Sequence, residues 1–211
     1  LDDTVRAIIC PDKISSSRWL EIMASAHSLG LPTTATIMFG HIEGVDSWAQ
    51  HWLQIIMLQR LTSGFTECVP LPFVSDGSPI YRSGGARPGP TWREAKLMHA
   101  VLRLMAGKHI PNIQASWVKL GHVGAISMLS CGANDLGGVL VNESITRAAG
   151  ASHGEYWSPQ KMIEAIQSIS RVPVQRHTDY KPCKPTLNRT WVQPVSVYNT
   201  PAKRRATEKL L

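Results

Sequence analysis

The sequence predicts a parallel α/β fold, because segments with the pattern of buried strands alternate with helical segments at about forty residues per unit. The chain has 211 residues, of which 43% are apolar, so it is long and apolar enough to bury a substantial core. No apolar run approaches the roughly 18 residues that a membrane span needs, and no membrane partner is expected. We expect about four βα units.

The first unit is a predicted helix that ends near Gly30, followed by a strand over 33–39. Ser15, Ser16 and Ser17 offer N-cap oxygens, apolar residues then recur with helical spacing, and Pro32 prevents the helix from continuing. Residues 33–39 are β-branched and mostly apolar, as is typical of a parallel strand buried on both faces.

The same alternation continues along the chain. Further helices are predicted from residue 45 and over about 92–106, 121–131 and 159–169, with extended segments over 65–70, 112–118, 138–141 and 172–176. The connection over 74–90 is rich in Ser, Gly, Pro and Arg, so it is either a functional lid or a mobile surface insertion.

The positive charge of the chain is concentrated at its C-terminal end. The formal net charge is +7, yet residues 181–211 alone carry seven Lys or Arg against one acid, which leaves 1–180 close to neutral. We therefore expect a folded part over 1–180 and a basic, mostly disordered tail over 181–211. A nucleic-acid partner is not expected, although a non-catalytic binding module that acts through the tail remains an alternative.

The four cysteines are too far apart for a local metal site. Cys10, Cys68, Cys131 and Cys183 match neither a CxxC pattern nor a dense secreted disulfide framework. Reduced thiols in an intracellular protein are expected, with cytoplasm and plastid not distinguished. An iron–sulfur cluster requires several thiolates brought together, and this chain is not expected to supply them.

Polar residues follow the strand over 33–39 at its carboxyl end, where ligands bind in parallel barrels. Gly40 lets a ligand approach the backbone, and His41 lies beside it. Glu43 either accepts hydrogen bonds from a ligand or braces the loop. The alternative is a simple glycine turn with a solvated Glu43.

A second polar set lies on the predicted strand over 112–118. The period of two places Asn112, Gln114 and Ser116 on one face, which either lines a barrel lumen near a ligand or satisfies its own hydrogen bonds in the core. Asn134 and Asp135, in a glycine-rich break, either orient a substrate or take a proton, or else form a structural Asx turn.

Two charged residues complete the candidates. Glu67 lies within a predicted strand, where a carboxylate is costly unless a ligand or an Arg compensates it. Arg176 ends the last extended segment and can bind an anionic group with both guanidinium nitrogens, whereas a surface salt bridge is the ordinary alternative.

Five segments together resemble the FO synthase family, and within it the second subunit or domain, CofH. The segments are CPDK at 10–13, TTATIMFGHIE at 33–43, FTECVPLPF at 65–73, NIQASWVKLG at 112–121 and GANDLGG at 132–138. The resemblance covers about residues 1–180. It implies the C-terminal half of a TIM-like barrel that belongs to the radical S-adenosylmethionine (SAM) enzymes.

The same resemblance implies the reaction and its cofactors. A tyrosine-derived 4-hydroxybenzyl group is joined to 5-amino-6-(D-ribitylamino)uracil on the way to the deazaflavin FO, with L-tyrosine as the other substrate. SAM and a [4Fe-4S] cluster held by a CxxxCxxC motif are the cofactors. A radical SAM enzyme of the futalosine branch of menaquinone synthesis is the alternative within the same barrel type.

The resemblance also assigns candidate residues. The segment over 36–43 is similar to a GxIxGxxE strand motif that supports the adenine of SAM, with a threonine in place of the first glycine; its candidates are Thr36, Met38, Gly40, His41 and Glu43. The substrate-facing candidates are Glu67, Asn112, Gln114, Ser116, Asn134, Asp135 and Arg176.

No CxxxCxxC motif occurs in this sequence. The chain is therefore expected to start about midway through the barrel, to need the N-terminal half of the barrel as a partner, and to be unable to cleave SAM alone. A half-barrel leaves strand edges unpaired, so aggregation or dependence on a partner is expected.

Overall fold

The computed structural model describes residues 1–140, 143–151 and 156–183. It divides into two compact units, Leu1–Met162 and Ile163–Leu211, which are described separately. The predicted basic tail lies outside the described residues from position 184 onward. None of the helices in the described ranges is long and apolar enough to cross a membrane.

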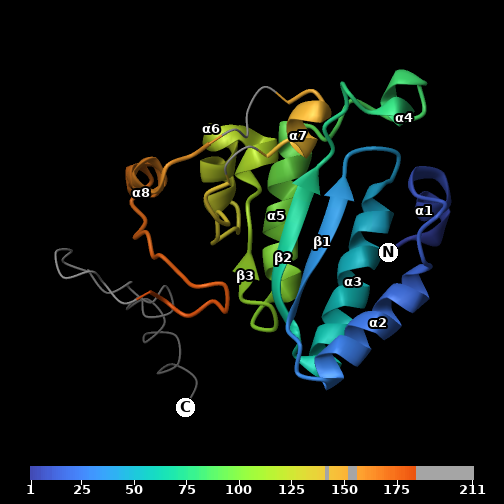
Figure 1. The fold of residues 1–211 in the computed structure, drawn as a ribbon, viewed down its shortest axis with the longest axis horizontal. Helices are drawn as coiled ribbons and strands as arrows, with labels where there is room; N and C mark the ends of the chain where they lie inside the picture. Colours follow the sequence, from blue (N-terminus) through green and yellow to red (C-terminus); the bar gives the residue numbers. More distant parts are fainter. Residues whose placement is uncertain (141–142, 152–155, 184–211) are drawn as a thin grey trace, which may run out of the picture. The chain divides into compact units, whose positions relative to one another are not determined.

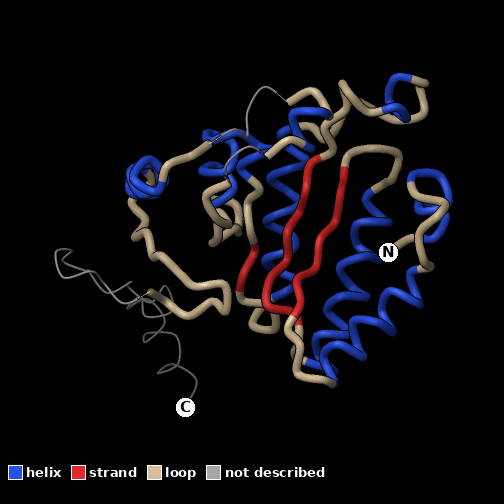
Figure 2. The backbone as a smooth tube through the Cα atoms, viewed as in Figure 1, coloured by secondary structure: helices blue, strands red, loops and turns tan. Residues whose placement is uncertain are grey.

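The first unit contains a parallel sheet with the strand order β1-β2-β3 (Figures 1 and 2). Its strands are β1 (Thr33–Phe39), β2 (Phe65–Pro72) and β3 (Asn112–Ile113), and its helices are α1 (Asp3–Ile9), α2 (Ser16–Ser28), α3 (Val45–Thr62), α4 (Pro79–Arg82), α5 (Trp92–Ala106), α6 (Trp117–Leu129) and α7 (Ile145–Ala148). Helix α8 (Pro159–Ser168) spans the boundary between the units. The predicted mixed α/β class with a parallel sheet is confirmed.

The predicted helices form where their end signals lie. Ser15 caps α2 by accepting a hydrogen bond from the Arg18 amide. At the start of α5, Thr91 and Glu94 form a capping box, in which each side chain accepts from the backbone amide of the other residue. Helix α5 spans 92–106, as predicted.

The prediction that β1 is buried on both faces is wrong. Ala35, Ile37 and Phe39 are buried, whereas the intervening Thr34, Thr36 and Met38 are exposed. Helices α3 and α5 pack on one face of the sheet, and within the described residues no second helix layer covers the other face of β1. The exposed face therefore remains accessible.

Three predicted extended segments differ from the structure. The strand over 112–118 ends at Ile113, because Ser116 becomes the N-cap of α6 and Trp117 begins the helix. The segment over 138–140 forms no strand, and position 141 lies outside the described residues; a parallel bridge between Gln114 and Asp135 extends the sheet instead. In the second unit, 172–176 forms only an antiparallel bridge between Arg176 and Pro182.

Candidate functional site

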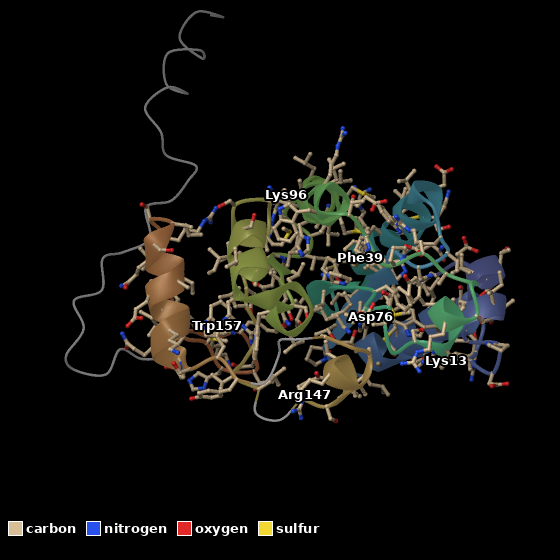
Figure 3. All side chains as sticks on the ribbon, turned by 90° about the horizontal axis from the view of Figure 1, so that it is seen from above. Lys13, Phe39, Asp76, Lys96, Arg147 and Trp157 are labelled. Atoms are coloured by element: carbon tan, nitrogen blue, oxygen red, sulfur yellow. The ribbon has the colours of Figure 1, made fainter. Side chains whose placement is uncertain are left out.

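The carboxyl ends of the parallel strands bring the candidate residues to one edge of the sheet. Figure 3 looks onto this edge, with Phe39 at the end of β1, Asp76 on the connection after β2 and Arg147 on α7. The β1 strand runs directly into Gly40, and Phe39 accepts a hydrogen bond from the Phe73 amide just beyond β2 at 2.8 Å. The two strand ends are thereby held together.

Glu43 braces the turn that follows β1. Its Oε1 accepts hydrogen bonds from the Gly40 amide and from Trp48 Nε1 at 2.7 Å, and its Oε2 accepts from the His41 amide at 2.9 Å. Burial opposes ionisation, but the hydrogen bonds from His41, Gly40 and Trp48 outweigh it and lower the pKa of Glu43 to about 2. The carboxylate thus already accepts hydrogen bonds from its own loop and from Trp48 of α3.

His41 is also enclosed by the chain, with 2% of its surface exposed. Its Nδ1 lies 2.8 Å from Glu43 Oε2 and 2.8 Å from the Ile42 amide, and its Nε2 lies 3.2 Å from the carbonyl oxygen of Met38. One ring nitrogen contacts the turn and the other contacts the last residues of β1. We conclude that His41, like Glu43, holds the backbone of the turn.

The space beside Gly40 is filled by the chain. Gly40 has φ +92°, and a Cβ there would lie 2.3 Å from the Pro90 ring. Gly40 was expected to let a ligand approach the backbone. In the structure it instead lets the connection before α5 pack against the end of β1. The Arg87 amide adds a hydrogen bond to the carbonyl of His41 at 3.0 Å.

Thr36 and Met38 are the motif residues that remain accessible. They lie on the face of β1 opposite the helices, and Met38 is 42% exposed. The register of the parallel pair places Thr36 beside Val69 and Met38 beside Leu71. This face could therefore present a mostly apolar wall with one hydroxyl to a ligand.

The next row of side chains toward the amino ends of the strands is polar. Thr34, Glu67 and Asn112 occupy matching positions on β1, β2 and β3, so they share one face of the sheet. Glu67 is 3% exposed, and Asn112 donates from Nδ2 to the Thr66 carbonyl at 2.9 Å. This polar row crosses three strands and shares only Asn112 with the predicted face of Asn112, Gln114 and Ser116 along one strand.

Gln114 continues this face beyond β3. Its backbone amide donates to the Cys68 carbonyl at 3.0 Å, and its carboxamide packs against Gly137, where an added Cβ would lie 2.8 Å from Nε2. Ser116, in contrast, is buried at the start of α6 and is not on a strand. Of the three predicted face residues, Asn112 and Gln114 are brought together at the sheet.

Asn134 and Asp135 shape the backbone. Asn134 Oδ1 accepts from the Ile113 amide at 2.8 Å and from Arg103 at 2.7 Å, which fixes the start of β3 against α5. Asp135 Oδ1 accepts from the Gly137 amide at 2.6 Å, as in the Asx turn considered above. Asp135 also pairs with Gln114 through the parallel bridge.

The long connection over 74–90 is tied to its neighbours at this edge. It contains α4, and the Gly77 amide donates to the Ala149 carbonyl at 2.8 Å, next to α7. A Cβ at Gly77 would lie 2.2 Å from the Ala148 carbonyl oxygen. With the Pro90 contact at its other end, the connection forms a wall between β1 and α7.

Arg176 belongs to the second unit. Its guanidinium carbon lies 4.2 Å from the centroid of the Tyr180 ring, and Nη1 donates to the His177 carbonyl at 3.3 Å. The role of Arg176 toward a substrate stays a prediction.

The residues in the described ranges do not form a metal centre. No group of three or more His, Cys, Asp or Glu side chains gathers there, and no disulfide joins the four cysteines. Cys68 is buried, and this burial together with nearby Glu67 raises the pKa of its thiol to about 12, which opposes the thiolate form that an iron–sulfur cluster requires. These residues do not fit a [4Fe-4S] cluster.

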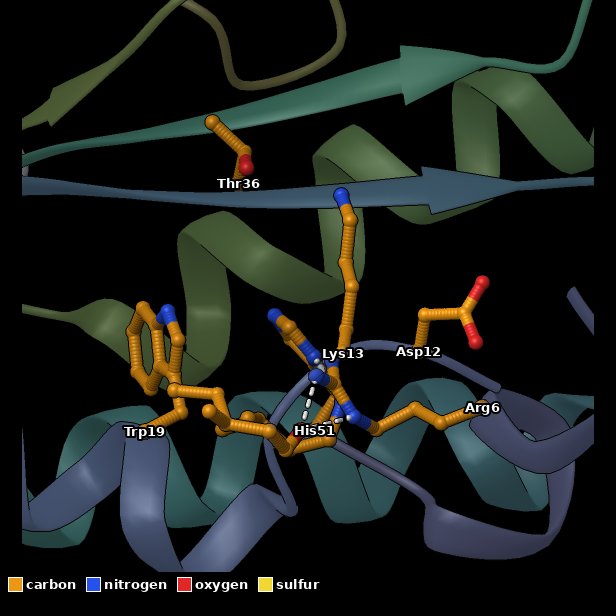
Figure 4. Close-up of a pocket in the computed structure, with 8 residues that line it drawn as sticks. Arg6, Asp12, Lys13, Trp19, Thr36 and His51 are labelled. Atoms are coloured by element: carbon orange, nitrogen blue, oxygen red, sulfur yellow. Dashed lines mark hydrogen bonds between the residues drawn. The ribbon is translucent and has the colours of Figure 1, made fainter. Parts of the chain in front are cut away.

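A cavity of about 500 Å³ lies between β1 and the segment that connects α1 to α2 (Figure 4). Its labelled lining residues are Arg6, Asp12, Lys13, Trp19, Thr36 and His51. His51 is 5% exposed, its Nε2 has no hydrogen-bond partner among the described residues, and burial lowers its pKa to about 3. The sequence alone did not predict this cavity, because its lining comes from the N-terminal end with α1, the connection after it, α2, β1 and α3.

Known proteins were then compared with the chain. A model of the family described as "CofH/MqnC C-terminal region" matches residues 62–188. The chain is 51% identical over 180 residues to a 5-amino-6-(D-ribitylamino)uracil–L-tyrosine 4-hydroxyphenyl transferase of Methanopyrus kandleri, which covers 85% of this chain and 49% of that protein. The corresponding protein of Methanothermobacter thermautotrophicus is 48% identical over 181 residues, with 86% and 49% covered.

A third relative is the FO synthase of Streptomyces coelicolor, which is 45% identical over 182 residues, with 86% of this chain and 21% of that protein covered. The chain thus spans about half the length of the archaeal relatives and about a fifth of the longer FO synthase. The family match covers more than half of the chain and agrees with the predicted resemblance. The chain belongs to the family described as the CofH/MqnC C-terminal region.

Proposed function

We propose that the complete protein containing this chain is a radical SAM transferase that joins a tyrosine-derived 4-hydroxybenzyl group to 5-amino-6-(D-ribitylamino)uracil in FO formation. The observation that carries the proposal is the 51% identity over 180 residues to a transferase named for these two substrates. The family description also includes MqnC, which keeps the futalosine-branch enzyme as the second candidate. The names of the relatives described above favour FO formation.

The chain supplies half of a barrel in this proposal. Strand β1 lies at one edge of the described sheet, where a further parallel strand could pair with it. The cavity lies beside this edge, and Thr36 of β1 lines it. A preceding half of the protein would add strands at this edge and close the cavity. Without that half, the edge promotes association or aggregation.

SAM would contact this chain through the open face of β1. Thr36 offers a hydroxyl and Met38 a thioether, which packs well against an aromatic ring. The buried Gly40, His41 and Glu43 would act by fixing the turn that ends this wall. SAM, when bound with a reduced cluster, would supply radical chemistry, and the described residues of this chain do not fit that cluster.

The substrates would face the polar row. Glu67 and Asn112 share a layer of the sheet, and Gln114 and Asp135 follow at the next position. A buried carboxylate and two carboxamides suit the several N–H and O–H groups of a ribitylaminouracil or of tyrosine. Ser116, Asn134 and Arg176 complete the proposed set, and Asn134 would act by holding the backbone of β3.

The test uses co-expression of the 211-residue chain with the N-terminal half of the Methanopyrus kandleri relative. After anaerobic reconstitution, we expect tyrosine- and uracil-dependent product by mass spectrometry, SAM binding by calorimetry, and neither from the chain alone. Glu67→Gln should reduce product at least ~10-fold with SAM binding retained, whereas Glu21→Gln, on an exposed helix, should change neither. Product from futalosine-branch substrates but not from these two would refute the assignment.

A further inference from the structure

Helix α3 is apolar on the side that faces away from the sheet as well as on the side that faces it. Its inner face buries Trp48, Trp52, Ile55 and Ile56. Its outer face carries an uninterrupted row at every fourth position, and all five residues of the row are exposed: Val45, Ala49, Leu53, Met57 and Leu61. Exposed Asp46, Gln50 and Arg60 border this row, so the outer face carries an apolar stripe with polar edges, and an exposed apolar patch with a polar rim is typical of an interaction site.

The neighbouring helix extends this surface. Trp52 of α3 donates a hydrogen bond to Met98 of α5 at 3.2 Å, so the two helices lie side by side (Figure 1). On α5, Leu97, Val101 and Leu104 are 49%, 47% and 82% exposed. Rows of residues spaced by four form the ridges that interlock when helices pack. The outer faces of α3 and α5 therefore form one apolar surface suited to helix packing.

Apart from His51, α3 has two ionisable side chains, and they lie at opposite ends of the row. Asp46 lies in its first turn and Arg60 in its last turn, and neither forms an ion pair or a side-chain hydrogen bond within the described residues. An antiparallel copy of the same helix, centred on Leu53, would bring Asp46 beside Arg60 of the other copy. It would also set Val45 against Leu61 and Ala49 against Met57. The surface is thus complementary to itself, as a two-fold dimer requires.

We propose that the outer faces of α3 and α5 form the interface of a symmetric homodimer. The two helices are about 27 and 22 Å long at 1.5 Å per residue. At a spacing of about 10 Å they present about 500 Å² per copy, or about 1,000 Å² in total, which reaches the lower bound for a specific interface. A preceding half that adds strands at β1 lies in the plane of the sheet, so it leaves this surface uncovered.

Sedimentation velocity of the 211-residue chain across the micromolar range tests the proposal. We expect a dimer, and a Leu53→Glu/Met57→Glu variant should raise its dissociation constant at least ~100-fold, because two carboxylates per copy would be buried without partners. Leu29→Glu, at the exposed end of α2, serves as the matched control and should leave the dimer intact. Circular dichroism verifies that each variant folds. A monomer at all concentrations, or a dimer that the double variant leaves unchanged, overturns the proposal.

Cross-linking tests the two-fold axis directly and separates this interface from association at the β1 edge. In a background with Cys10→Ser, Cys131→Ser and Cys183→Ser, Leu53→Cys should form a disulfide dimer with itself under mild oxidation. Leu61→Cys should cross-link with Val45→Cys in a mixture but not with itself. Self-linking by Leu61→Cys with none by Leu53→Cys would overturn the antiparallel arrangement.

Discussion

Replacing Glu43 by glutamine tests the bracing of the turn after β1. The substitution keeps the shape of the side chain but removes its charge, so its amide group must face one of the N–H donors that now surround the carboxylate. The pKa of Glu43 falls from 4.5 to about 2 on folding. At 1.36 kcal/mol per unit, ionised Glu43 contributes about 3 kcal/mol to the free energy of unfolding.

The pH dependence follows from the direction of this shift. Because the folded pKa is lowered, the contribution is complete above the unfolded pKa near 4.5 and is lost as the pH falls through about 2. We expect Glu43→Gln to lower the free energy of unfolding by about 2–3 kcal/mol at pH 7, and by about half as much at pH 3.

Urea unfolding followed by tryptophan fluorescence measures this difference. The control is Glu21→Gln, which removes a salt bridge to Arg18 whose side chains are both 63% exposed, and it should change the free energy by less than ~0.5 kcal/mol. The reasoning is refuted if Glu43→Gln costs no more than this control at pH 7, or if its cost is the same at pH 3 as at pH 7.

Three further substitutions or reactions probe the same unit. Gly40→Ala should lower the free energy of unfolding by at least ~2 kcal/mol in the same urea assay, because its Cβ would overlap the Pro90 ring at a positive φ. Gly44→Ala, whose Cβ would have no atom within 4 Å, should cost less than ~1 kcal/mol. Asn134→Ala should cost about 2 kcal/mol in this assay, since it leaves the Ile113 amide of β3 without its side-chain acceptor, and a loss below ~0.5 kcal/mol would count against that role. Cys68 should resist iodoacetamide at pH 8 in the folded chain, because its thiol pKa is raised to about 12; mass spectrometry should find it modified only after the other three cysteines.

The regular elements of the first unit were largely predictable. The helix over 92–106 agrees with the structure because its capping box and apolar spacing lie within its own sequence. The strand over 33–39 agrees because Pro32 and Gly40 bound it. Local signals are sufficient where an element begins and ends at residues of its own.

The strand over 112–118 shows where local signals fail. Its alternating polar and apolar residues favour a strand, but Gln114 pairs with Asp135 and the chain turns into α6 at Ser116. Where the strand ends depends on contacts with residues about twenty positions away, and the periodicity of the local sequence carries no information about such contacts. For the same reason, the sequence predicted that Asn112 and Gln114 share a face but not that Glu67 would lie beside Asn112.

In the candidate site, too, local features were predictable and contacts with distant residues were not. That Gly40, His41 and Glu43 follow a strand end was predictable, whereas the occupant of the space beside Gly40 was not, because Pro90 comes from a connection fifty residues later. Glu43 was left open as a ligand acceptor or a brace, and the hydrogen bonds that it accepts from the turn and from α3 favour the brace.

The contact of Gly77 with the end of α7 limits how this protein can be redesigned. A Cβ at position 77 would lie 2.2 Å from the Ala148 carbonyl, so the connection over 74–90 and the segment over 145–150 fit each other as a matched pair. A loop taken from a relative to change substrate choice would therefore have to be transplanted together with its partner segment. If either segment were transplanted alone, its side chains would clash with the backbone of the other segment, whatever their effect on the substrate.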